Sequence, residues 1–155
     1  NQIIDKALAW NADFVLFVDG DITVVPWSAI TMAHTMQHRP DVHCLGAHWE
    51  GWTSDPSKAS TALVNTPYLV KCDMIAPTQY GMWSRRLMET VRFDENFGAG
   101  YGFEDDAYFI DMKTAGFQPH IFFGMTYLHR HIHHGHLKHE NGDVLYEQRR
   151  EYTLK

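Results

Sequence analysis

The chain has 155 residues, of which 45% are hydrophobic and 14% aromatic, and its 13 Lys and Arg against 19 Asp and Glu give a net charge of −6. That length and composition allow a hydrophobic core and exclude a collagen, a coiled coil, wholesale disorder and a disulfide scaffold. The negative charge argues against binding to nucleic acid, whose phosphates are neutralised by Lys and Arg, so we expect no nucleic-acid partner. No apolar run approaches the roughly 20 residues of a membrane-spanning helix, and we expect neither a membrane span nor a signal peptide.

Cysteine and histidine usage adds two expectations. Cys44 and Cys72 stand in apolar surroundings without a CxxC spacing, which predicts buried thiols in a reducing compartment, the cytoplasm, with one disulfide as the alternative. Histidine is abundant, with 11 in the chain, and the segment from His129 to His139 is the richest in it. The chain begins with Asn1 inside a predicted helix, so we expect a fragment of a longer protein.

The first third of the chain predicts alternating helices and strands. Apolar residues recur at helical spacing over residues 3–10, and Asn11 follows as the helix end. The continuous apolar run 14–18 predicts a short strand that is covered on both faces of a sheet. Ser28 is predicted to cap a second helix, and a further strand is predicted over residues 42–49.

The composition of the chain changes after residue 49. Residues 50–67 are rich in Gly, Ser and Pro, which predicts a polar loop, and with Trp49 and Trp52 this loop would close over a ligand as a lid. The absence of an internal repeat or linker predicts one α/β domain. The remaining predicted elements are strands over residues 68–76 and 118–129, a helix over 85–91 capped by Ser84, and a helix over 104–114 that Gly116 ends.

Two acids flank a glycine directly after the predicted strand 14–18, as Asp19-Gly20-Asp21. Ligands of open α/β sheets commonly bind at the carboxyl ends of strands, and carboxylate oxygens suit hard cations such as Mg²⁺, which keep positions for substrate phosphates. The glycine would let a ligand approach the backbone closely. The alternative is an ordinary Asp-Gly turn with two solvated acids, and the motif by itself leaves both open.

Three consecutive acids, Glu104, Asp105 and Asp106, follow a Gly-rich stretch over residues 97–102. A carboxylate at this place would accept a proton from a substrate hydroxyl, as a general base does. The structural alternative is that acids in the first turn of a helix are simply favoured by its dipole. Taken alone, the pattern favours this structural alternative.

His129, His131 and His133 alternate, which places them on one face if the strand continues, and His134 follows. Imidazole is a common ligand of borderline metals, so the segment predicts a zinc site, a single metal ligand with surface neighbours, or a merely polar stretch. Most of these histidines must be bystanders, because a four-coordinate metal cannot use them all. A zinc-dependent hydrolase that joins them to the acidic pair after strand 14–18 is one functional alternative.

Taken in order, an apolar strand, Asp-x-Asp, a Gly-rich loop with Glu-Asp-Asp and a strand ending in histidine resemble the nucleotide-sugar glycosyltransferases of the GT-A fold, most closely the family 2 type. Residues 12–21, 93–106 and 113–117 carry the resemblance. It implies a Rossmann-like mixed sheet flanked by helices, here a partial catalytic domain over residues 1–140 with a polar tail over 141–155. The family's first βαβ portion, which binds the nucleotide, is missing, so an N-terminal portion or a second chain would complete the site.

The resemblance implies a metal site at the Asp-x-Asp motif. Asp19 and Asp21 would bind Mn²⁺ or Mg²⁺, with Asp21 as the more direct ligand. His129 matches the family's third metal ligand, and His131 is the next candidate. The cation would neutralise charge on the departing nucleoside diphosphate.

The resemblance also implies the catalytic residues. Asp105 matches the general base of inverting enzymes, and Glu104 would help to hold the acceptor. A strand of small residues before a helix that begins with Arg is implied near Trp83, whose ring would stack on a sugar or, as the alternative, lie in the core. Further donor or acceptor contacts are implied for Gly20, Gly102 and His131.

The expected activity is therefore transfer of a sugar from a nucleotide-sugar donor to a hydroxyl of a glycan, a lipid or a protein. A GT-A enzyme that retains the anomeric configuration is the alternative within this class. Outside it stand the zinc-dependent hydrolase and a noncatalytic carbohydrate-binding module, for which the aromatic content would suffice.

Overall fold

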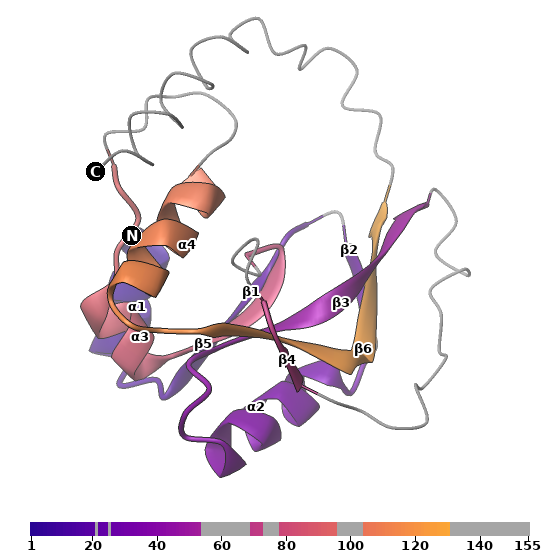
Figure 1. The fold of residues 1–155 in the computed structure, drawn as a ribbon, viewed down its shortest axis with the longest axis horizontal. Helices are drawn as coiled ribbons and strands as arrows, with labels where there is room; N and C mark the ends of the chain where they lie inside the picture. Colours follow the sequence, from indigo (N-terminus) through magenta and orange to yellow (C-terminus); the bar gives the residue numbers. More distant parts are fainter. Residues whose placement is uncertain (21, 25, 54–68, 73–77, 96–103, 131–155) are drawn as a thin grey trace, which may run out of the picture.

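Six strands form one mixed sheet in the computed structural model of the protein, which describes residues 1–20, 22–24, 26–53, 69–72, 78–95 and 104–130 (Figure 1). The strands are β1 (Phe14–Val18), β2 (Ile22–Val24), β3 (Cys44–Thr53), β4 (Leu69–Lys71), β5 (Tyr80–Ser84) and β6 (Pro119–Arg130). They follow the order β1-β5-β3-β6-β2, and β4 also pairs with β6. Strands β3 and β6 are parallel, and the other described pairs are antiparallel.

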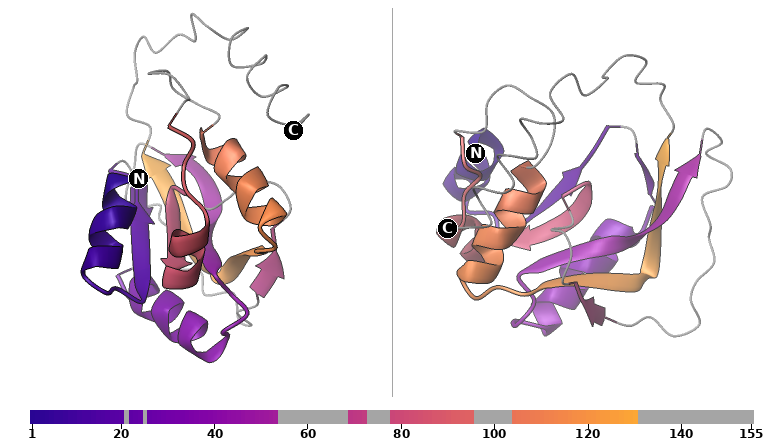
Figure 2. Two further views of the ribbon diagram at one scale, coloured as in Figure 1. Left: turned by 90° about the vertical axis from the view of Figure 1, so that its left-hand side faces the viewer. Right: turned by 45° about the horizontal axis from the view of Figure 1, so that its top comes forward.

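Helices cover both faces of this sheet. Those described are α1 (Gln2–Ala9), α2 (Ser28–His38), α3 (Arg85–Thr90) and α4 (Glu104–Thr114). Buried residues of α1, α3 and α4 share one core with the sheet, and those of α2 share a second core with its other face (Figures 1 and 2). The predicted α/β class, a mixed sheet flanked by helices, is confirmed.

Two of the helices end where a residue adopts a left-handed conformation. Asn11 has a φ of 58°, and the N–H of Ala12 donates to the C=O of Ala7 at 3.0 Å, which closes α1. Gly116, with a φ of 85°, closes α4 in the same way. Asn and Gly tolerate this conformation and satisfy the last carbonyls of a helix. Both helix ends were predicted from the sequence and are confirmed.

Strand β1 contributes to both cores. Val15 and Phe17 pack against the core under α1, α3 and α4, whereas Phe14 and Leu16 pack against the core over α2. Successive side chains of a strand point to opposite faces, so a run of five apolar residues serves both. The prediction of a strand covered on both faces is confirmed, although β1 stands at one end of the described strand order.

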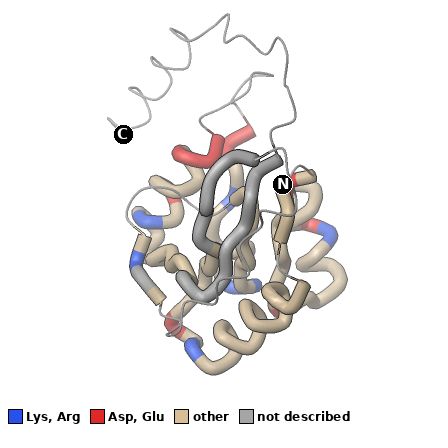
Figure 3. The backbone as a smooth tube through the Cα atoms, turned by 90° about the vertical axis from the view of Figure 1, so that its right-hand side faces the viewer, with Lys and Arg blue, Asp and Glu red and all other residues tan. Residues whose placement is uncertain are grey.

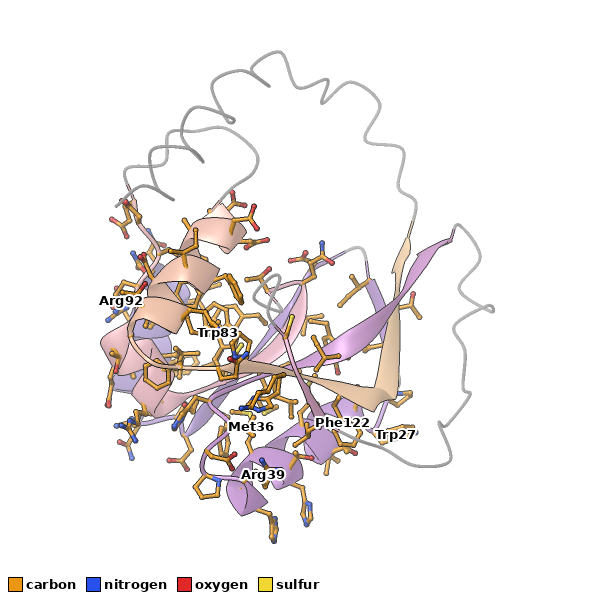
Figure 4. The ribbon with its side chains drawn as sticks, in the orientation of Figure 1. Trp27, Met36, Arg39, Trp83, Arg92 and Phe122 are labelled. Atoms are coloured by element: carbon orange, nitrogen blue, oxygen red, sulfur yellow. The ribbon has the colours of Figure 1, made fainter. Side chains whose placement is uncertain are left out.

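An aromatic cluster joins α4 to the sheet. The ring of Trp83, on β5, stacks on that of Tyr108, on α4, with centroids 4.4 Å apart and planes 9° from parallel. Phe17 of β1 lies 4.2 Å from the Trp83 ring, and Phe93 lies 4.5 Å from the Tyr108 ring. Trp83 has 0% of its surface exposed and lies between α4 and the sheet (Figure 4). These rings hold the first half of α4 against β5 and β1.

The second core corrects the prediction that Ser28 caps α2. Ser28 is buried as the first residue of the helix, its hydroxyl is hydrogen-bonded to the hydroxyl of Tyr80, and Trp27 is the N-cap without a side-chain bond. The Ser28 hydroxyl therefore links α2 to β5 instead of capping the helix. Met36 and Phe122 also lie on the α2 side of the sheet (Figure 4). The cap predicted for α3 is confirmed, because Ser84 accepts a hydrogen bond from the Leu87 N–H at 3.3 Å.

The predicted polar loop begins later than expected. Strand β3 continues to Thr53, paired with β6 through two register shifts, so Trp52 belongs to a strand rather than to the loop, and Trp49 lies in that strand as predicted. Long-range pairing with β6 overrides the local turn preference of Gly51. Residues 54–68 lie outside the described residues, and the lid hypothesis with them, as does the tail 141–155.

Both cysteines are free thiols, as predicted, but only Cys44 is buried, whereas Cys72 is half-buried. Cys44 pairs with Pro119 on one side of β6, and the N–H of Cys72 donates to the C=O of Pro119 from the other side at 2.9 Å. Two strand spacings of about 4.8 Å separate them, beyond the roughly 7 Å between Cα atoms that a disulfide spans. Burial raises the pKa of the Cys44 thiol. No described helix combines the length and the apolar character needed to cross a membrane.

Replacing Trp83 by Ala should lower the free energy of unfolding by about 3–5 kcal/mol, because it removes a fully buried aromatic side chain and leaves a cavity against Tyr108. Trp10→Ala is the matched control: that tryptophan is 80% exposed, and its loss should change stability by no more than about 0.5 kcal/mol. Urea unfolding followed by circular dichroism measures both. Equal effects of the two substitutions would contradict the aromatic core.

Candidate functional site

The first predicted motif lies at the carboxyl end of β1. The N–H of Asp19 donates to the C=O of Gln79 at 2.9 Å, and the N–H of Ile22 donates to the C=O of Asp19 at 3.4 Å. Asp19 and Gly20 are exposed, and a Cβ on Gly20 would meet no atom within 4 Å. The turn therefore presents the Asp19 carboxylate at an open corner of the sheet. Asp21 lies outside the described residues.

The second motif lies in the first turn of α4, where Figure 3 shows acidic residues gathered. The pKa of the Asp105 carboxyl is raised from 3.8 to about 6. Burial contributes most to this rise, a hydrogen bond from Thr78 opposes it, and the negative charges of Glu104, Asp19 and Asp106 add to it. Burial disfavours a charged carboxylate, and like charges add to that effect. Asp105 therefore changes protonation near neutral pH.

The charge of Asp19 acts on Asp105 although the two residues are far apart in the sequence. Strand β5 explains why they meet. It pairs with β1, so that Val18 lies opposite Tyr80 and the backbone of Asp19 is hydrogen-bonded to Gln79. The Trp83 ring of the same strand stacks on Tyr108 of α4. The end of β1 and the start of α4 are thereby brought to one corner.

The backbone register brings a third predicted position to the same end of the sheet. His129 of β6 pairs with Ile22 of β2, one residue beyond the Asp19-Gly20-Asp21 motif. The strand position that the resemblance assigns to the third metal ligand therefore neighbours that motif. The side chain of His129 lies outside the described part, as do Gly102, His131, His133 and His134 entirely.

Within the described residues, no group of three or more His, Cys, Asp or Glu side chains gathers as a metal site. Two of the three predicted ligands are not among the described side chains. The corner does suit a hard cation, because its carboxylates repel one another strongly enough to contribute to the raised pKa of Asp105, and Mg²⁺ and Mn²⁺ prefer oxygen ligands. The residues that would hold such an ion are Asp19 with Asp21 and His129.

Trp83 does not lie at this site as a sugar-binding surface. Its ring contacts those of Tyr108 and Phe17, and none of its surface is exposed. Of the two alternatives for this residue, the core position is the one observed. The sequence carries no local signal for Thr78, whose hydrogen bond lowers the pKa of Asp105.

Comparisons with known proteins do not assign a family. No protein-family model matches the sequence, and no curated protein matches it. The chain is similar to the crystal structure of A197 from STIV, with 10% sequence identity and a TM-score of 0.49. The likeness covers 81% of this chain but only 62% of that one.

Asp105→Asn should stabilise the protein at neutral pH. The folded pKa of about 6 lies above the ordinary 3.8, so ionisation of Asp105 favours the unfolded state as pH rises from about 4 through about 6. Asparagine does not ionise, so the variant keeps the free energy of unfolding that the unmodified protein loses in this pH range. Its gain in unfolding free energy should grow from near zero at pH 4 to about 1–2 kcal/mol at pH 7, allowing for solvent screening.

Urea unfolding at a series of pH values measures this gain. Asp106→Asn is the matched control, because it removes a carboxylate from the same helix turn and should keep most of the pH dependence of the unmodified protein. A constant difference between Asp105→Asn and the unmodified protein from pH 4 to pH 8 would show that the Asp105 carboxyl is not perturbed.

Proposed function

We propose that the protein is a metal-dependent glycosyltransferase that moves a sugar from a nucleotide-sugar donor to a hydroxyl of a glycan, lipid or protein acceptor. The observation that supports it most is the convergence of Asp19 and Asp105 at one corner, where the charge of Asp19 helps to raise the pKa of Asp105. In the resemblance to GT-A glycosyltransferases, the motif of Asp19 corresponds to donor binding and the motif of Asp105 to base catalysis. A structural helix start alone gives no reason for the end of β1 to lie beside it.

Asp105 has the protonation behaviour of a general base. A carboxyl with a pKa of about 6 is largely ionised at neutral pH and still basic enough to accept a proton from a hydroxyl in the transition state. It would take the acceptor's proton as the acceptor oxygen attacks the anomeric carbon, opposite the departing diphosphate. A base in this place favours inversion, and the anomeric proton of the product, read by NMR, distinguishes it from retention.

The donor end would be organised by Asp19. Its exposed carboxylate, with Asp21 and His129, would hold Mn²⁺ or Mg²⁺, whose chemistry is to neutralise the charge that builds on the departing nucleoside diphosphate. Glu104, in the first turn of α4, is close enough to affect the pKa of Asp105 and would help to hold the acceptor. The open turn at Gly20 leaves room for a ligand beside the backbone.

The architecture is in keeping with the finer fold assignment, GT-A, which we propose. Strand β5 (Tyr80–Ser84) contains Gly81, lies antiparallel between β1 and β3, and is followed directly by α3, which begins with Arg85. A strand with small residues before a helix that begins with Arg is what the resemblance implies here. The parallel pair β3 and β6 makes the sheet mixed, as expected for that fold.

A donor-turnover assay tests this proposal. Release of nucleoside diphosphate is measured with a panel of nucleotide sugars and acceptors, first with Mn²⁺ and then with EDTA. Activity should need one donor and the cation, and Asp105→Asn should lower it by a factor of about 10²–10⁴. Asp111→Asn, farther along α4, is the control and should retain activity.

Two results would contradict the proposed function. One is the absence of turnover with every donor together with no thermal stabilisation by any nucleotide. The other is turnover that Asp105→Asn leaves unchanged. Activity that EDTA abolishes without any need for a sugar nucleotide would instead favour the zinc-dependent hydrolase.

A further inference from the structure

Two histidines lie one turn apart on the outer face of α2. The inner face of this helix carries Met32 and Met36, which are buried in the second core, whereas His34 and His38 are exposed. Residues four positions apart lie on the same side of a helix. The rings of His34 and His38 have their centres 4.2 Å apart, with planes 32° from parallel. The two imidazoles therefore stand next to each other where solvent reaches them.

A hydrogen bond determines which nitrogen of His38 is available to a ligand. Its Nδ1 lies 2.9 Å from the backbone oxygen of His34. A carbonyl oxygen only accepts hydrogen bonds, so Nδ1 carries the proton and, in the neutral ring, Nε2 keeps its lone pair. Histidines that bind metals usually donate their other ring N–H to a carbonyl or carboxylate, which sets the tautomer and the orientation of the ring. His38 is thus held in the form that a metal ligand takes.

The spacing of the two rings suits one shared metal ion. Zn–N bonds are about 2.0–2.1 Å long, so two nitrogens bound to one zinc ion lie no more than about 4 Å apart. Rings whose centres are 4.2 Å apart can meet this condition by rotation of the side chains alone. Histidines at positions i and i+4 of a helix are also the pair that helical zinc sites use.

The charges around the pair favour a cation. His38 is the last residue of α2, and the partial negative charge at the carboxyl end of a helix attracts cations. The next residue, Arg39, donates two hydrogen bonds to the Asp41 carboxylate, at 2.9 and 2.7 Å, so a neighbouring acid balances its charge. The helix itself contains no Lys or Arg. Repulsion of a bound cation is therefore small.

We propose that His34 and His38 form a binding site for a borderline divalent transition metal such as Zn²⁺, with two imidazole ligands from α2 and water in the remaining positions. Imidazole suits ions of this class, whereas Mg²⁺ prefers oxygen ligands. Because water completes the coordination, the ion exchanges with solution more readily than an ion with four protein ligands.

This site lies away from the corner at Asp19. Helix α2 approaches that corner with its first residue, Ser28, which is hydrogen-bonded to Tyr80. His38 is at the opposite end of the helix, beside Arg39 (Figure 4). Helix α4 covers the other face of the sheet (Figures 1 and 2). Metal binding by α2 is therefore independent of the proposed function, and either can fail without the other.

A zinc titration followed by NMR of the histidine rings tests the site. Zn²⁺ is added to the metal-free full chain, and ¹H–¹⁵N spectra report each ring separately, with His34→Gln and His38→Gln used to assign the two signals. Both rings should respond along one saturation curve, His38 through its Nε2. In each single variant the remaining ring should need about 10²-fold more zinc, because the second ligand of the chelate is lost.

His43→Gln is the matched control. That histidine lies outside α2, with its Nδ1 2.9 Å from the hydroxyl oxygen of Ser84, and its replacement should leave the response of His34 and His38 unchanged. A chelator buffer sets the concentration of free Zn²⁺, so that zinc bound by other histidines does not alter the curve.

Three results would overturn the site. The first is a response of the two rings only at millimolar free zinc. The second is a response of one ring that stays the same when the other histidine is replaced. The third is coordination of His38 through Nδ1, because zinc at that nitrogen would break the hydrogen bond to the His34 carbonyl on which the tautomer depends.

Discussion

The stack of Trp83 on Tyr108 is the contact on which the candidate site depends. It is the place where α4, the helix that carries Asp105, meets β5, the strand that pairs with β1. Tyr108 lies three residues after Asp105, so side chains from nearly one helical turn lie over the same region of the sheet. A shift of this stack would move the start of α4 away from Asp19. The aromatic core therefore positions the start of α4 relative to the end of β1 as well as contributing stability.

Five influences on Asp105 set its ionisation, and they do not all act in the same direction. Burial is the largest and raises the pKa, the neighbouring carboxylates raise it further, and the hydrogen bond from Thr78 lowers it. A fold selected only for stability would not bury a carboxylate beside other acids, because both the burial and the repulsion between like charges cost free energy at neutral pH. Carboxylates placed so unfavourably are more often found at functional sites, where activity is kept at the expense of stability.

The elements that were predictable from sequence are those defined by short-range signals. The apolar run 14–18 matched β1, Ser84 capped α3, and the acids and Gly116 bounded α4. Each depends on groups within one or two turns of the chain. The candidate site residues Asp19, Glu104 and Asp105 were predicted in the same way, from residue type beside an element boundary.

What could not be predicted depends on strand pairing. The extension of β3 to Thr53 follows from its parallel ladder with β6, and the burial of Ser28 follows from its bond to Tyr80 on another strand. Thr78 is the clearest case. Nothing in its sequence surroundings marks it as a residue that affects the pKa of Asp105, which is more than 20 positions away in the sequence.

The topology explains why one corner receives all these groups. Strand β5 runs antiparallel to β1, so the residues that precede β5 lie where β1 ends, and this places Thr78 near Asp19. Strand β2 follows the Asp19 turn and pairs with the last residues of β6, which places the backbone of His129 at the same end. In open α/β sheets the carboxyl ends of parallel strands are where ligands bind. Here β1 and β6 run in the same direction, because β1 and β3 are both antiparallel to β5 and β3 is parallel to β6. The carboxyl ends of β1 and β6 therefore open toward one side, and α4 begins beside one of them.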